Sequence, residues 1–166
     1  MARIDLKNAI IYLEDSNGLS LEVKIGEGNL TYTETKNREY RLNRGILDDV
    51  VNADEAPMDV NFQFVWVYRK SPSSSSTASG GTPTIDDALK QQGAAANWVS
   101  TDADLCRPYA VDIKIVYTPD CSTGDVETIV LPDFRYETLN SDIGGSAVDC
   151  TGKCNATEPT NVRTAQ

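Results

Sequence analysis

The sequence predicts a mainly β protein, an antiparallel β-sandwich or barrel with one short α-helix on its flank. Apolar residues recur at every second position in several segments, turn-forming residues separate these segments, and only one stretch carries helix start and stop signals. Strands do not alternate with helices as they do in parallel sheets. A chain of 166 residues fits one domain, which we place at residues 1–166.

Alternation is clearest in three segments, which we expect to be strands at 19–25, 58–68 and 111–117. In the second segment, Val65 and Val67 make the far end apolar on both faces. We expect that end to be covered by another sheet, by the helix or by a neighbouring subunit.

The N-terminal segment changes its alternation partway. Ile4 and Leu6 have the opposite parity to Ile11 and Leu13, so one strand through all four needs a bulge near Asn8 or Ala9. Shorter strands are predicted at 29–34, 38–43, 126–131, 133–138 and 146–156.

The predicted helix follows a polar loop. Thr84 can cap a helix that starts at Ile85, Asp87 falls at the capping-box position, and Gly93 can end it after Gln92. The preceding Ser/Gly-rich segment, residues 71–81, has no side chain suited to anchor it, so we expect an exposed, flexible loop.

Charge and composition limit the partners. The net charge is −10, and tight binding to nucleic acid needs clustered positive charge. Tight DNA binding is therefore disfavoured, but an acidic protein can still line a channel through which DNA passes. The N-terminus lacks the apolar core of a signal peptide, and no segment is long and apolar enough to span a membrane. We therefore expect a cytoplasmic origin and no membrane partner.

No residue pattern favours catalysis. The chain has no histidine, which removes the usual general base and the Ser–His or Cys–His nucleophile. Three carboxylate groupings remain, and each is better explained as structural: Asp48-Asp49, Asp86-Asp87 and Asp102-Ala103-Asp104. The last grouping lacks the further ligand and glycine of a calcium loop. We predict no catalytic residue, cofactor or metal.

The state of the four cysteines is left open. Cys106, Cys121, Cys150 and Cys154 lie in a chain without an export signal, where free thiols are the default, although disulfides can form after release into an oxidising medium. Four zinc ligands in compact pairs are not available. Along a straight strand the Cα atoms of residues 150 and 154 would be roughly 13 Å apart, well beyond the ~5.5 Å of a disulfide. We favour the strand.

Several segments resemble the tail-tube proteins of long-tailed bacteriophages, and the resemblance spans most of the chain except the Ser-rich loop and the last residues. The segments are 2–9 (ARIDLKNA), 39–48, 54–64 (DEAPMDVNFQF), 84–89 (TIDDAL), 106–113 (CRPYAVDI), 131–136 (LPDFRY) and 152–155 (GKCN).

This resemblance implies a self-assembling virion protein. It implies six copies per ring, stacked rings around a DNA channel with acidic side chains in the lumen, other tail proteins as partners, and assembly in the host cytoplasm. DNA would pass without specific binding. Other virion parts are the main alternative: a tail terminator, a head–tail connector or a capsid-decorating protein. A β-sandwich carbohydrate-binding module is a third possibility, and an enzyme the last.

One charged segment is the candidate interface between rings. Basic residues are followed directly by acidic ones, so the two stretches either pair within one hairpin or project to meet a subunit of the adjacent ring. The residues are Lys36, Arg38, Arg41, Arg44, Asp48, Asp49, Asp54 and Glu55.

Overall fold

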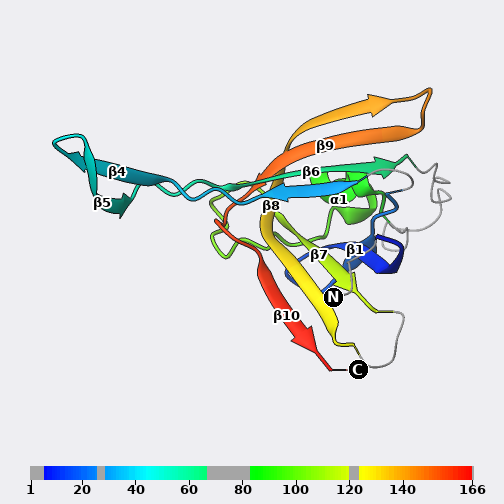
Figure 1. The fold of residues 1–166 in the computed structure, drawn as a ribbon. Helices are drawn as coiled ribbons and strands as arrows, with labels where there is room; N and C mark the ends of the chain where they lie inside the picture. The colour runs from blue at the N-terminus through cyan, green and yellow to red at the C-terminus, as the bar shows by residue number, and fades with distance from the viewer. Residues whose placement is uncertain (1–5, 26–28, 67–82, 120–123, 166) are drawn as a thin grey trace, which may run out of the picture.

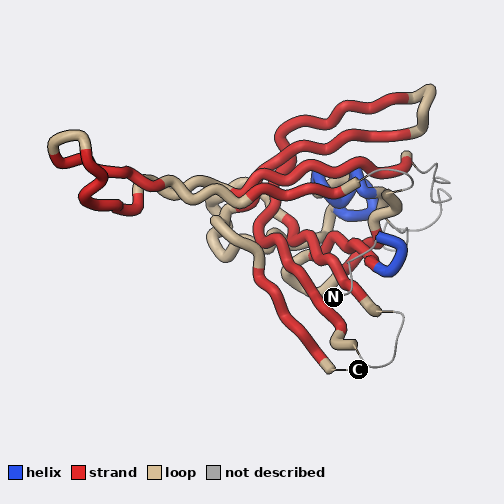
Figure 2. Tube along the Cα trace, in the orientation of Figure 1, coloured by secondary structure: helices blue, strands red, loops and turns tan. Residues whose placement is uncertain are grey.

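The computed structural model describes residues 6–25, 29–66, 83–119 and 124–165 (Figure 1). Strands dominate these residues, all strand pairs are antiparallel, and the described part contains one short α-helix (Figure 2). The predicted mainly β, antiparallel class with one short helix is therefore confirmed. The predicted flexible loop at 71–81 lies outside the described residues.

The elements follow in chain order. They are η1 (Leu6–Asn8), β1 (Ala9–Glu14), β2 (Ser20–Glu22), β3 (Leu30–Thr33), β4 (Arg38–Asn43), β5 (Ile46–Asn52), β6 (Met58–Val65), α1 (Ile85–Lys90), η2 (Gly93–Ala95), β7 (Val111–Tyr117), β8 (Val126–Asp142), β9 (Ala147–Cys154) and β10 (Thr160–Thr164).

Eight strands form one sheet that curls around a core, and we call this part of the molecule the body. The order is β2-β1-β7-β8-β9-β6-β3, and β10 pairs with the first part of β8. The chain directly after β2 bridges β1 and β6: Val23 N–H donates to Ile11 O in β1, and Val65 N–H in β6 donates to Lys24 O. The two halves of the sheet therefore face each other, with β8 shared between them (Figure 1).

The core explains the period-two pattern. Alternate residues of β1, β6, β7 and β9 point inward, and α1 adds three buried side chains. Phe62 packs against both Phe64 and Phe134, with ring centroids 5.9 Å apart in each pair. Burial of such a side chain contributes roughly 1.5–3 kcal/mol to the free energy of folding. These strands therefore form the stable frame from which the arm and the loops extend.

One continuous strand, β8, replaces the two strands predicted at 126–131 and 133–138. The break expected at Pro132 is a bulge opposite Asp112, because Val111 pairs with Phe134 but Ile113 pairs with Leu131. Asp133 takes a left-handed φ of 52° there, and its N–H donates to the Asp112 carboxylate at 2.9 Å. A bulge tolerates a residue without an N–H, so proline bends the strand without ending it.

The N-terminal segment does not form one strand in the described residues, so the bulge that a single strand would need does not arise. The change of parity is made by the 3₁₀ turn η1 before β1 begins at Ala9, and Asn8 O accepts the N–H of Thr118. Residues 4 and 5 of the predicted strand lie outside the described part of the chain.

The capping prediction for α1 is confirmed, but the helix ends earlier than predicted. Asp87 N–H donates to Thr84 Oγ1 at 3.1 Å and Thr84 N–H donates to Asp87 Oδ2 at 3.2 Å. Gln91, with a left-handed φ of 53°, ends the helix after Lys90, and Gln92 N–H bonds back to Asp87 O. Gly93 starts the next 3₁₀ turn instead.

Two strands were not predicted. The first is β5, which follows the predicted strand β4. The second is β10, whose five residues are all exposed and which therefore has no alternation of buried and exposed side chains. The strand predicted at 19–25 is shorter in the structure, where β2 ends at Glu22.

Candidate assembly surfaces

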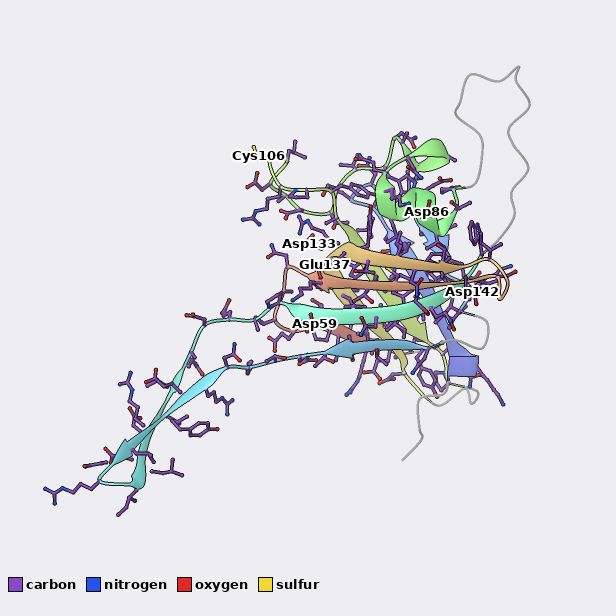
Figure 3. All side chains as sticks on the ribbon, turned by 90° about the horizontal axis from the view of Figure 1, so that it is seen from above. Asp59, Asp86, Cys106, Asp133, Glu137 and Asp142 are labelled. Carbon is purple, nitrogen blue, oxygen red and sulfur yellow. The ribbon has the colours of Figure 1, made fainter. Side chains whose placement is uncertain are left out.

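β4 and β5 form a two-stranded hairpin, here called the arm (residues 38–52), that projects away from the body (Figures 1 and 3). Its turn is Arg44-Gly45, with φ values of 51° and 79°. Positive φ at both central residues is the geometry that matches the twist of a two-residue hairpin. Glycine adopts it readily, which explains why the chain reverses there.

A bulge gives the arm one apolar and one charged face. Arg41 lies opposite Asp49, but the next residue, Leu42, lies opposite Leu47, so Asp48 is the extra residue. Directly opposed residues share a face, and faces alternate along each strand. One face carries Tyr40, Leu42, Leu47 and Val50, with Arg38 and Asn52 where the strands begin and end, and is here called the apolar face. The other, called the charged face, carries Glu39, Arg41 and Asp49 together with Asn43, Ile46 and Val51.

The apolar face of the arm is open to solvent. Tyr40, Leu42, Leu47 and Val50 are 62%, 64%, 69% and 50% exposed. An isolated two-stranded hairpin is at best marginally stable in water. Contiguous exposed apolar side chains on such an element indicate a protein interaction surface.

The charged segment forms one hairpin that projects from the body, and its contact with a subunit of an adjacent ring stays a prediction. Basic β4 pairs with acidic β5 in one hairpin, and that hairpin projects. Among the described residues of the arm, the one ion pair is Arg41 Nε with Glu39 Oε1 at 3.4 Å, within β4 itself. Lys36, Asp54 and Glu55 lie on the two connections to the body, where Asn37 Nδ2 donates to Asp54 O at 3.0 Å. These charges are therefore left available to a partner.

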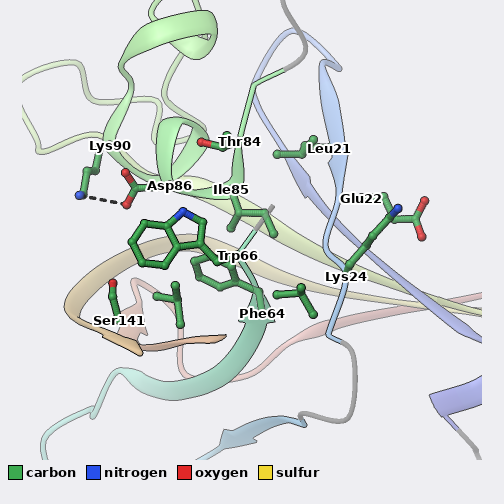
Figure 4. Close-up of a pocket in the computed structure, with 12 residues that line it drawn as sticks. Leu21, Glu22, Lys24, Phe64, Trp66, Thr84, Ile85, Asp86, Lys90 and Ser141 are labelled. Carbon is green, nitrogen blue, oxygen red and sulfur yellow. Dashed lines mark ion pairs between the residues drawn. The ribbon is translucent and has the colours of Figure 1, made fainter. Parts of the chain in front are cut away.

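A recess of about 400 Å³ opens at the other end of β6 (Figure 4). Strands β2, β6 and β9 and helix α1 supply its apolar lining, namely Leu21, Phe64, Trp66, Ile85 and Val148. Trp66 is 49% exposed. Glu22 and Lys24 lie on one side, while Lys90 and Asp86 are fixed to each other on the other side at 2.9 Å. The helix thus flanks the end of β6 at Phe64 and Val65 without filling the recess, and Val67 lies outside the described residues.

The acidic loop before β7 is a structural clamp. Asp102 is buried, and its Oδ2 accepts a hydrogen bond from Arg135 Nη2 at 2.7 Å. The side-chain hydrogen bond from Arg135 and the backbone N–H of Asp104 hold the pKa of Asp102 below its usual value. Arg107 lies 3.5 Å from both Asp102 and Asp104. Arg135 and Arg107 therefore pair with the carboxylates of this loop.

A second carboxylate cluster surrounds the β8 bulge. Burial raises the pKa of Asp112, while the N–H of Asp133 and the hydroxyl of Thr101 oppose this rise. Thr101 Oγ1 also donates to Asp133 Oδ1 at 2.9 Å. These acids serve the bend in β8. Within the described ranges, no three His, Cys, Asp or Glu side chains are grouped to hold a metal ion.

Cys150 and Cys154 lie on the buried face of β9, which runs as a strand through both positions as favoured above. Both are free thiols, and burial raises the pKa of each to about 12. Cys106 is also free but exposed, on a loop at the surface (Figure 3). Cys121 lies outside the described residues.

None of the helices in the described segments is long and apolar enough to cross a membrane. The apolar face and the recess were not predicted from the sequence. Tyr40 and Leu42 at alternate positions, followed by Asn43-Arg44-Gly45, gave a usable signal for an amphipathic hairpin. The recess joins segments far apart in the sequence and left no comparable signal.

No protein-family model matches the sequence, and no curated protein matches it. Solved structures do match. The fold is similar to a chain in the cryo-EM structure of the PVC sheath/tube terminator in the extended state, from an extracellular contractile injection system. That similarity covers 98% of both chains with a TM-score of 0.55 and 11% sequence identity.

A second similar structure is a chain of the anti-feeding prophage (AFP) baseplate, with a TM-score of 0.45, 8% identity, and coverage of 98% of this chain and 97% of that one. This second likeness is too weak to add to the first. At 11% identity, the first likeness shows that the two chains share a fold.

Proposed function

We propose that the protein is a structural subunit of a phage-tail-like particle and forms a closed ring at the end of the tail, as a tail terminator. One observation carries the proposal: the fold is similar to that of a chain in the sheath/tube terminator structure over 98% of both chains. The agreement leaves no large unmatched segment on either side, which supports the same architecture for this chain. This favours the terminator over the tube subunit that the sequence segments resemble.

The surfaces support an assembly role. The arm presents apolar side chains that a monomer leaves in water, and the recess provides a second, differently shaped apolar surface. Two distinct complementary surfaces on one subunit generate a head-to-tail contact, which closes into a ring when the rotation allows it. The chemistry also fits a non-enzymatic role, because the perturbed carboxylates are held by arginines or backbone N–H groups.

The charged face and base of the arm form the proposed contact with the adjoining ring. Lys36, Arg38, Asp54 and Glu55 lie at the base, and Arg41 and Asp49 lie on the charged face. Exposed charges of both signs suit a contact that must select its partner. The net charge of −10 suits a ring through which DNA passes without being held. The proposal also includes six copies per ring and other tail proteins as partners. The ring would assemble in the host cytoplasm before incorporation into the virion.

The tube subunit is the second candidate, and the segments shared with tail-tube proteins favour it. Gold labelling of particles assembled with a C-terminally tagged chain separates the two. A terminator places gold at one end of the tail, whereas a tube subunit places it along the whole tail. Particles without label, from cells that produce the tagged chain, would contradict both.

A further inference from the structure

The arm and the recess lie at opposite ends of β6. The arm joins the strand just before Met58, and Phe64 and Trp66 line the recess at its other end. Eight residues of strand separate the two surfaces by roughly 23 Å, and the arm points away from the body (Figure 1). Its apolar face therefore cannot enter the recess of its own chain.

The two surfaces match in chemistry. The arm offers aliphatic and aromatic side chains, and the recess offers Leu21, Phe64, Trp66, Ile85 and Val148. A volume of about 400 Å³ lies within the roughly 300–1,000 Å³ range of sites that bury apolar groups. The arm exposes all four of its apolar side chains, whereas the recess exposes chiefly Trp66, at 49%, over a floor formed by the buried core residues Leu21, Phe64, Ile85 and Val148.

Charges at the edges of both surfaces are complementary as well. Arg44 and Asp48 flank the apolar face at the tip of the arm, and Glu22 and Lys24 flank the recess. All four are exposed, and none forms an ion pair with another described residue. A second copy of this chain thus supplies the opposite sign at each position.

We propose that the apolar face of each arm packs into the Trp66 recess of the neighbouring copy in the same ring. This inference rests on the proposed ring. Leu42 and Leu47 contact Trp66, while Asp48 faces Lys24 and Arg44 faces Glu22 of the neighbour. The charged face then remains free for the adjoining ring, so the two faces of one hairpin make the lateral and the axial contact.

The test compares two aspartate substitutions at the arm tip. Leu47→Asp changes the apolar face, and Ile46→Asp changes the opposite face at a residue that is 73% exposed. Ring dissociation is followed by mass photometry and sedimentation velocity. We expect Leu47→Asp to raise the dissociation concentration about 30-fold or more, as for a central contact residue, and Ile46→Asp to change it less than about 3-fold. Unchanged circular dichroism confirms that both variants fold.

Two further measurements address the recess itself. Trp66 is half exposed and Trp98, the other tryptophan, is buried, so ring formation should shift tryptophan emission to the blue and reduce acrylamide quenching. Asp48→Lys or Lys24→Glu alone should weaken the ring, and the two together should restore it.

The outcomes separate this inference from the proposed function. Leu47→Asp rings as stable as wild-type rings would overturn the arm–recess contact while the ring proposal stands. Wild-type rings in which Trp66 is quenched as readily as in the monomer would do the same. Quenching of Trp66 that is already low in dilute monomer would also overturn the contact. A wild-type protein that stays monomeric at all concentrations would overturn both.

Discussion

Gly152 in β9 packs directly against the ring of Phe134 in β8. A Cβ atom at residue 152 would lie 2.7 Å and 2.8 Å from two carbons of that ring and would also collide with the carbonyl oxygen of Arg135. Glycine at this position lets β8 and β9 pair while Phe134 fills the core. The closeness of the two strands, and with it the shape of the body, depends on this absent side chain.

The first prediction follows from that contact. Gly152→Ala should lower the free energy of unfolding by about 1–3 kcal/mol, the usual cost of overpacking a well-filled core. Urea denaturation measures it. Thr151→Ala, at the exposed neighbouring position of the same strand, is the matched control and should change the value by less than about 0.5 kcal/mol. Equal stability of Gly152→Ala and wild type would show that β8 and β9 can separate freely.

The second prediction concerns pH and the Asp102–Arg135 pair. The pKa of Asp102 is lowered in the folded protein, so its carboxylate contributes stability above the unfolded-state pKa, and this contribution is lost as the pH falls through the folded value. Asp102→Asn should therefore lower Tm near neutral pH, and the difference from wild type should shrink below about pH 4. Asp104→Asn is the control, because its half-exposed carboxylate pairs with Arg107 and accepts the N–H of Cys106 but does not contact Arg135. A Tm difference independent of pH would contradict the ion-pair account.

Thiol reactivity gives the third prediction. With their pKa values raised to about 12 by burial, Cys150 and Cys154 have almost no thiolate at pH 8. In a Cys121→Ser background, Ellman's reagent should modify one thiol rapidly, that of exposed Cys106, and two more only on unfolding. Rapid modification of a β9 cysteine in the folded protein would mean that the strand opens. Peptide mapping that recovered a Cys150–Cys154 disulfide would contradict the strand geometry.

The fourth prediction tests the charged face of the arm. Arg41→Glu should leave rings intact and weaken their attachment to the adjoining ring, because it reverses a charge that faces outward. Retention of tagged rings on particles, compared between about 0.1 M and 1 M salt, measures the effect, since salt screens such contacts. Arg163→Glu in β10, another exposed arginine, is the control. Equal losses for both variants would show a general charge effect and no specific contact by the arm.

Much of the body could be predicted from the sequence because its strands bury one face. β6, β7 and β9 show their alternation directly, and the Thr84–Asp87 capping box marks the start of α1. The errors lie where local chemistry is ambiguous. Pro132 predicts the end of a strand, but it lies in a bulge of β8 where the carboxylate of Asp112 accepts the N–H of Asp133.

The arm was only half predictable. Its charges are evident in the sequence, but the bulge at Asp48 shifts the parity of β5, so Leu47 and Val50 do not read as one face. β10 buries nothing and therefore has no pattern. The recess depends on the curl of the sheet, which brings β2, β6, β9 and α1 together and which no local sequence property encodes.

The most direct test of the central claim is negative-stain electron microscopy of the purified full-length protein, combined with native mass spectrometry for the number of copies. We predict closed, single rings of uniform size with six copies, formed more readily as the protein concentration rises. Monomers alone, across salt and concentration, would contradict the account.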